Sequence, residues 1–320
     1  MVTTIMKNKI NYINIEKIAE LFGTDVYGLG ERCRSFYETL DMSYEPIEGE
    51  EKERLILDIL KKIDSDEQII GAAERTAAWQ NGWQENLDDF RKEKNKQSIV
   101  PKFIRPDKIV RFDKQFIRPN NKYFEKDYTT LLQLYVYHRV ISKNIENVYE
   151  FGAGSGYNLI NLMDYNPNLN LYGSDFVQSS VDLINEMGHH YDTNLKAEVF
   201  NMIEPDYNYE IKPNSCIFTH GAVEQLASQV KNIINFFVHK KPEICFHIEP
   251  TVEFYDNNDL FDYLQTKFHR KRGYSTGLVP YLLELQDQGK IEIKECRRLF
   301  FGSKFMEGYN LVIWKPIQTL

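Results

Sequence analysis

The chain has 320 residues, enough to bury one large hydrophobic core or two smaller ones. Its net charge of -8 argues against a general affinity for nucleic acid, because phosphate binding needs an excess of lysine and arginine. We see no secretory signal, no apolar run near the ~20 residues that span a bilayer, and no metal-ligand spacing among the four cysteines. We therefore expect a soluble, cytoplasmic protein with reduced thiols and no membrane partner.

The first 122 residues are expected to be mainly helical. Apolar residues recur at helical spacing over residues 15–22, 55–63 and 69–90. Trp79 and Trp83 are four residues apart and share one helical face. They could stack on a substrate ring or pack against the rest of the protein. We place a helical substrate or cover region at 1–122 and a second domain at 123–320.

Residues 91–122 are strongly basic, with eleven Lys or Arg against three Asp or Glu. One interpretation is a solvated linker. The other is a strap laid across the site, in which Arg105, Arg111 and Arg118 meet an anionic substrate or a cofactor carboxylate.

After residue 127, short apolar runs alternate with helical patterns, which predicts an α/β fold with a parallel sheet covered on both faces. One of the expected helices covers residues 223–239. The rhythm changes at the end of the chain, where 291–300 and 311–314 indicate two strands of an antiparallel hairpin.

The most informative stretch runs from residue 147 to 175: a strand, a glycine-rich turn, a helix and a second strand that ends in an acid. Gly152, Gly154 and Gly156 let the backbone approach a ligand closely. Tyr157 departs from the dinucleotide pattern G-x-G-x-x-G. Glu150 would repel a pyrophosphate but suits a ligand with a cationic end. This charge logic favours S-adenosylmethionine (SAM) over NAD.

The motif E-F-G-A-G-S-G at 150–156, with Asp175 ending the next strand, resembles the cofactor motif of class I SAM-dependent methyltransferases. The resemblance covers about residues 125–320 and implies a seven-stranded Rossmann-like sheet with a C-terminal antiparallel hairpin. It implies SAM as cofactor and S-adenosylhomocysteine (SAH) as product. It also implies that Asp175 binds the ribose hydroxyls and that Phe176 covers the adenine. The remaining cofactor residues that it implies are Glu150, Gly152, Ala153, Gly154, Gly156, Asn201, Met202 and His220.

Two clusters lie where a base for methyl transfer is expected, at the carboxyl ends of the fourth and fifth strands. The first is His220 with Glu224, and the second is His247 with Glu249. His220, His247 and Glu249 could form a base with its orienting partner, or a metal site. The alternative is that the histidines are satisfied core residues, that Glu249 binds backbone, and that Asp175 is a helix N-cap. The expected substrate-binding residues are Trp79, Trp83, Arg118, Tyr255 and Arg272.

The hypothesis from the sequence is a methyltransferase acting on an oxygen or nitrogen atom of a polar small molecule, such as a sugar or phosphorylated precursor of a surface glycan or a specialised metabolite. Methylation of a protein side chain or of tRNA, an NAD-dependent oxidoreductase, and a non-catalytic SAM-binding subunit stay open as alternatives. The expected partner is a small-molecule acceptor rather than nucleic acid, and a homo-oligomer is compatible with the sequence.

Overall fold

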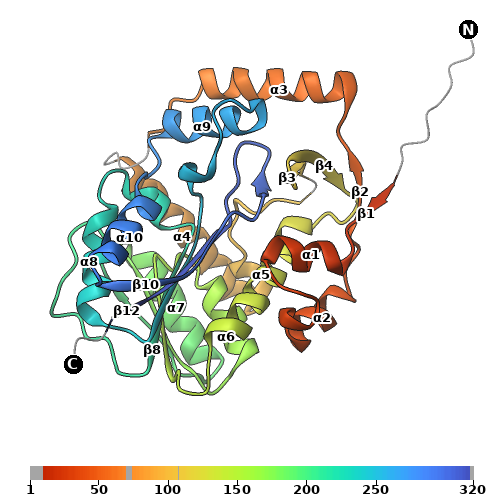
Figure 1. The fold of residues 1–320 in the computed structure, drawn as a ribbon. Helices are drawn as coiled ribbons and strands as arrows, with labels where there is room; N and C mark the ends of the chain where they lie inside the picture. The colour runs from red at the N-terminus through yellow and green to blue at the C-terminus, as the bar shows by residue number, and fades with distance from the viewer. Residues whose placement is uncertain (1–9, 70–73, 107, 318–320) are drawn as a thin grey trace, which may run out of the picture.

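The computed structural model describes residues 10–69, 74–106 and 108–317. Within them, a seven-stranded sheet has the order β10-β12-β9-β8-β5-β6-β7 (Figure 1). Its strands are β5 (Asn147–Phe151), β6 (Asn170–Asp175), β7 (Leu195–Val199), β8 (Ser215–His220), β9 (Ile244–Glu249), β10 (Ile291–Arg297) and β12 (Asn310–Pro316).

The strands β7, β6, β5, β8 and β9 pair in parallel, and β12 runs antiparallel to both of its neighbours, β9 and β10. The predicted parallel sheet with C-terminal antiparallel strands is therefore confirmed. The hairpin forms one edge of the sheet, with β12 next to β9 and β10 at the border.

Helices cover both faces of this sheet. Successive residues of a strand point to opposite faces. In β5, Val148 packs in the cluster that contains residues of α5 (Phe124–Val140), α6 (Tyr157–Tyr165) and α7 (Gln178–His190). Its neighbour Tyr149 packs in the cluster with α8 (Val230–Lys240) and α10 (Leu278–Asp287). Burial on both faces explains why these strands appear in the sequence as continuous apolar runs.

The N-terminal region is mainly helical, as predicted, and also contributes four strands to a second, smaller sheet. Its helices are α1 (Ile15–Phe22), α2 (Glu31–Tyr37), α3 (Gly49–Asp64) and α4 (Glu74–Glu93). The small sheet has the order β1-β2-β4-β3-β11, with β1 (Asn11–Tyr12), β2 (Ser43–Pro46), β3 (Val110–Phe112), β4 (Gln115–Pro119) and β11 (Phe301–Ser303). Short 3-10 helices lie at Tyr27–Leu29, Lys96–Ile99, Val223–Leu226 and Val252–Phe254.

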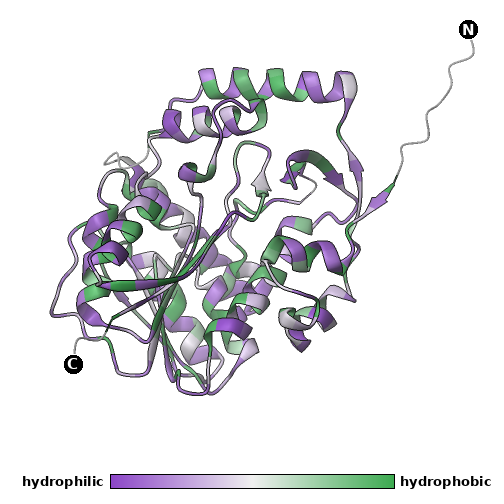
Figure 2. Cartoon of the chain, viewed as in Figure 1, coloured by the Kyte–Doolittle hydropathy of each residue, from purple (hydrophilic) through white to green (hydrophobic). Residues whose placement is uncertain are grey.

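The strand β11 comes from the segment between β10 and β12, so the small sheet joins the two ends of the chain. The helix α3 makes a second connection, because it packs beside α9 (Leu260–Arg272) (Figure 1). Leu55, Ile59 and Ile63 of α3 meet Leu264 and Phe268 of α9. Figure 2 shows hydrophobic and hydrophilic residues alternating along α3, as expected for a helix with one buried face.

A buried arginine fastens the small sheet to the C-terminal half. Arg111 of β3 is fully buried, and it donates to the backbone oxygens of Lys304 at 3.1 Å and Phe261 at 2.8 Å. Its guanidinium lies 3.9 Å from the centre of the Phe261 ring. Arg111 therefore has a packing role here. The boundary between residues 122 and 123 stays a prediction.

Candidate functional site

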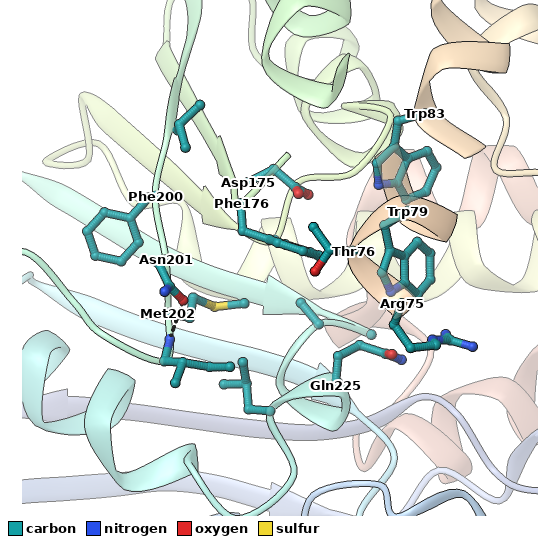
Figure 3. A pocket seen from close by; sticks show the side chains of 16 residues that line it. Arg75, Thr76, Trp79, Trp83, Asp175, Phe176, Phe200, Asn201, Met202 and Gln225 are labelled. Atoms are coloured by element: carbon teal, nitrogen blue, oxygen red, sulfur yellow. Dashed lines mark hydrogen bonds between the residues drawn. The ribbon is translucent and has the colours of Figure 1, made fainter. Parts of the chain in front are cut away.

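A pocket of about 360 Å³ opens where the carboxyl ends of β5, β6, β7 and β8 meet (Figure 3). The strand ends and the loops after them form its floor, and α4 forms its wall. The lining residues are Arg75, Thr76, Trp79 and Trp83 of α4, with Gly152, Asp175, Phe176, Val199, Phe200, Asn201, Met202, Ile203, Gly221, Ala222, Gln225 and Leu226. This edge of a parallel sheet is where ligands bind in open α/β folds.

Two glycines of the glycine-rich loop lie close to neighbouring side chains. Gly152 has φ +77°, and a Cβ there would lie 2.4 Å from the Cβ of Ala222. Gly154 has φ +53°, and a Cβ there would lie 2.7 Å from the ring of Trp83. Both positions therefore need glycine for conformation and for space. Gly152 lines the pocket, whereas Gly154 lies beneath Trp83.

Asp175 ends β6 and reaches both the pocket and the glycine-rich loop. Its Oδ2 accepts the backbone N–H of Gly154 at 2.9 Å, and its Oδ1 accepts that of Val177 at 3.2 Å. Burial raises the pKa of the Asp175 carboxyl to about 6 although these bonds oppose the shift. The carboxylate thus supports the turn into α7 and still borders the pocket. A carboxylate has further lone pairs to offer to a ligand hydroxyl.

Of the expected cofactor residues, the pocket brings together Gly152, Asp175, Phe176, Asn201 and Met202. The Phe176 ring is 44% exposed, which leaves an aromatic face open to a ligand. The side-chain oxygen of Asn201 accepts the N–H of Ile203 at 2.9 Å and so serves its own loop. The other expected residues, Glu150, Ala153, Gly154, Gly156 and His220, do not line the pocket.

Glu150 is fully buried beside a chain of polar side chains. Its Oε1 accepts from the Asn158 amide at 2.6 Å, whereas its Oε2 has no partner among the described residues. Asn158 in turn accepts from Gln133 at 2.7 Å, and the same Gln133 nitrogen lies 3.4 Å from Nδ1 of His220. Burial raises the pKa of the Glu150 carboxyl well above its usual range. This series of polar contacts links Glu150 to His220 through Asn158 and Gln133, which the sequence did not predict as site residues.

His220 and Glu224, the first predicted base cluster, both lie near Tyr309. The His220 ring meets the Tyr309 ring edge-on at 5.7 Å, and burial lowers the pKa of His220 to about 4. The Glu224 carboxylate accepts from the Gln225 amide at 2.6 Å. Burial, then the negative charge of Glu249, raises the pKa of Glu224 to about 8. Both groups are therefore largely uncharged at neutral pH.

Glu249 and His247, the second predicted cluster, have structural partners. The Glu249 carboxylate accepts the backbone N–H groups of Ala222 at 3.0 Å, Val223 at 3.1 Å and Glu224 at 3.4 Å. It thereby holds the turn after β8. Burial raises its pKa to about 7. The helix expected over 223–239 is divided at this turn into a 3-10 helix and α8, with Ala227 at φ +50° between them.

His247 lies in the core between the rings of Phe237 and Trp314. The indole N–H of Trp314 donates to its Nε2 at 2.9 Å, and its Nδ1 lies 2.8 Å from the Thr219 hydroxyl. Burial lowers the pKa of His247 to about 3. Because both ring nitrogens of His247 and the carboxylate of Glu249 are engaged by core and backbone groups, we do not retain these two residues as catalytic candidates.

The five expected substrate residues separate into two groups. Trp79 and Trp83 line the pocket and stack on each other with ring centres 5.7 Å apart. The other three lie outside the lining. Arg118 pairs with Glu51 at 2.5 Å, the Tyr255 hydroxyl donates to the backbone oxygen of Glu307 at 3.1 Å, and Arg272 pairs with Asp66 at 2.8 Å.

In the basic segment 91–122, five of the eleven cations pair with acidic side chains that the structure describes. Arg105 is exposed. The pairs are Arg91 with Glu186, Lys96 with Asp164, Lys102 with Glu85 and Asp89, Lys108 with Glu125, and Arg118 with Glu51. The local excess of cations in the sequence therefore does not form one unpaired basic surface.

Sequence reasoning missed Arg75, Thr76 and Gln225 in the lining, and Gln133 and Asn158 in the polar chain. Gln225 directly follows Glu224, a predicted site residue, so the sequence did indicate that it lies near the site. The others depend on how α4, α5 and α6 pack, which no local pattern indicates.

The part of the chain that the structure describes contains neither a cluster of metal ligands nor a membrane-spanning helix. No group of three or more His, Cys, Asp or Glu side chains there is arranged to hold a metal ion. None of the helices in the same ranges is long and apolar enough to cross a membrane.

No protein-family model and no curated protein sequence matches the chain. Solved structures do match it. The [4+2]-cyclase SpnF is 10% identical with a TM-score of 0.51, and the match covers 75% of this chain and 96% of that one. The small RNA methyltransferase HEN1 is 15% identical with a TM-score of 0.42, over 60% and 25%. An O-methyltransferase family 2 protein from Planctomyces limnophilus is 12% identical with a TM-score of 0.39, over 53% and 51%.

The match therefore spans about half the length of the Planctomyces protein and a quarter of HEN1. At these identities the likeness shows the fold alone. Together with the strand order, it shows that the chain has the fold of class I SAM-dependent methyltransferases.

Proposed function

We propose that this chain binds SAM in the pocket and transfers its methyl group to an oxygen or nitrogen atom of a polar small molecule. The observation that carries the proposal is the meeting of Gly152, Asp175, Phe176 and Met202 in one pocket at the strand ends. These four residues come from three separate segments of the sequence, and the fold brings them together in one pocket of ligand size.

The residues present suit the parts of this cofactor. The buried Asp175 carboxylate can accept from ribose hydroxyls. The exposed Phe176 ring and the Met202 thioether offer apolar surfaces to a purine. Glu150 does not line the pocket, so the ammonium group is not assigned to it, although one oxygen of its buried carboxyl has no partner among the described residues. When bound, SAM supplies an electrophilic methyl group.

The chain itself must orient the acceptor and remove a proton. Orientation can account for much of such a rate enhancement. For proton removal we assign Glu224, because its neighbour Gln225 lines the pocket and its amide holds the Glu224 carboxylate. With a pKa of about 8, Glu224 becomes a competent base as the pH rises through that value. Neutral His220 is the second candidate, and it is tied to Glu150 by the polar chain.

A sugar-like or phosphorylated acceptor, belonging to a surface glycan precursor or a specialised metabolite, remains our narrower proposal. The pairing of the basic segment with acids gives no support to a tRNA acceptor. A different activity is also tested, because SpnF, a matched structure with a TM-score of 0.51, is a [4+2]-cyclase and fold alone does not specify a reaction. Binding of SAM without methyl transfer is therefore the second candidate.

Isothermal titration calorimetry tests the cofactor. We expect SAM and SAH to bind and NAD not to bind. Asp175→Ala should weaken binding on the order of tenfold to a hundredfold, because it removes hydrogen bonds to a charged group. Glu198→Ala, an exposed acid on neighbouring β7, is the matched control and should bind normally. Binding of NAD in place of SAM would contradict the proposal, and SAM binding without SAH formation from any acceptor would leave only the second candidate.

A further inference from the structure

One end of the pocket holds two buried polar atoms that have no hydrogen-bond partner among the residues described: Nε of Arg75 and Oε1 of Gln225. Both side chains line the pocket, and Figure 3 shows them at the same end, below Trp79. A buried polar atom without a partner costs roughly 1–3 kcal/mol. Such atoms in a pocket are places where a ligand completes the bonding.

Arg75 is held in place by a stack of rings. Its guanidinium lies 5.3 Å from the centre of the Trp79 ring, and Trp79 stacks on Trp83. Trp83 rests on Gly154, where even a Cβ would come within 2.7 Å of the indole. A guanidinium stacked on an aromatic face keeps its N–H edge free for a planar oxyanion.

Unlike several other arginines, Arg75 forms no ion pair with an acidic side chain among the described residues. Within the described ranges no ion pair to Arg75 is found, whereas Arg91, Arg118 and Arg272 each meet a carboxylate within 4 Å. The charge of Arg75 acts on the Glu224 carboxyl, but burial keeps that carboxyl largely protonated at neutral pH. Arg75 thus brings positive charge to a largely apolar pocket.

We propose that Arg75 is the anion anchor of the acceptor site, so that the acceptor carries a carboxylate or phosphate group for Arg75 and a hydroxyl or amine that donates to Gln225. This inference rests on the proposed function and narrows its substrate class to anionic, hydrogen-bond-donating small molecules. The donor group that meets Gln225 lies next to Glu224, which is the group assigned to accept a proton from it. An amine has a further N–H for Glu224, whereas a hydroxyl turns its single proton from Gln225 to the ionised Glu224 before that proton is removed. The anchor and the base then act on two parts of one molecule.

The experiment uses full-length protein saturated with SAH and a pair of probes of the same shape, 4-hydroxybenzoate and its neutral amide, 4-hydroxybenzamide. Quenching of tryptophan fluorescence reports binding, because two of the three tryptophans line the pocket. We expect the wild type to bind the acid at least tenfold more tightly than the amide. Arg75→Met should bring that ratio close to one. Arg75→Lys should give an intermediate ratio, because lysine keeps the positive charge but lacks the paired N–H donors of the guanidinium.

Arg54→Met is the control, because Arg54 lies on α3 with its side chain 74% exposed. It should keep the wild-type ratio. Equal binding of both probes by the wild type, or failure to bind the acid, would overturn the anchor. A tenfold loss of SAH affinity in Arg75→Met would overturn it too, since Arg75 would then serve the cofactor. Failure of the wild type to bind SAH at all would instead sink the proposed function.

Discussion

The floor and the wall of the pocket differ in how their residues come together. The floor is made by strand ends that a parallel sheet brings to one edge, so residues such as Gly152 and Asp175 meet wherever the fold forms. The wall is one face of α4, held over the glycine-rich loop by its packing on α7. Under the proposed function, the floor holds the cofactor and the wall holds the acceptor.

Trp83→Ala tests the wall and should have the largest effect. The Trp83 side chain is 8% exposed, and truncation of a buried tryptophan costs about 3–5 kcal/mol. We expect a large fall in the midpoint of thermal or denaturant unfolding. Trp79→Ala, on the same helix face but less buried, is the comparison and should cost less. Equal stability of the wild type and Trp83→Ala would mean that α4 does not pack on the loop.

Gly152→Val tests the floor. A side chain there would collide with Ala222 and would have to adopt a positive φ, so the loop must move. We expect SAM affinity in calorimetry to fall on the order of a hundredfold, equivalent to about 2.7 kcal/mol. Gly289→Val is the control for strain alone, because Gly289 has φ +69° with nothing within 4 Å of its Cβ position. If both variants bind SAM normally, the glycine loop is not part of the cofactor site.

Glu224→Gln tests the assigned base, which lies between floor and wall, through the pH dependence of stability and turnover. The folded-state pKa of Glu224 is raised from 4.5 to about 8, so the folded protein binds a proton that the unfolded chain releases. Stability from this group is therefore complete below pH 4.5 and is lost as the pH rises towards 8. Wild-type turnover should rise over the upper part of the same range. The glutamine variant should show a flatter stability profile and turnover lowered by about tenfold or more. An unchanged rate profile would exclude Glu224 as the base.

Arg118→Ala should have the smallest effect, since Arg118 lies on β4 away from both surfaces. Its pair with Glu51 is half-exposed, and such pairs contribute roughly 0–1 kcal/mol. We expect a nearly unchanged unfolding midpoint and unchanged SAM and acceptor affinity. A clear loss of acceptor affinity would return Arg118 to the substrate site, where the sequence had placed it.

The sequence allowed the sheet, its C-terminal antiparallel strands and the glycine–acid floor to be predicted, because apolar periodicity and the 147–175 motif are local signals. It did not separate Glu224 from Glu249. Glu224 follows one parallel strand and Glu249 ends the next, but only the folded turn directs three backbone N–H groups at Glu249. His247 was ambiguous for the same reason, since the Trp314 indole that satisfies it lies 67 residues away. Arg75 carried no signal, because its importance depends on which helix face covers the pocket.

The pairing of β11 with β3 has a consequence for how the protein folds. It places Phe301 opposite Phe112, about 190 residues earlier in the chain. During synthesis the N-terminal strands must wait, with an open edge, until β11 has also left the ribosome. Contacts this distant in sequence slow folding and prolong the exposure of unpaired edges. Chains shortened before β11 should therefore aggregate, even though the glycine-rich loop and the first five strands of the large sheet are already present in them.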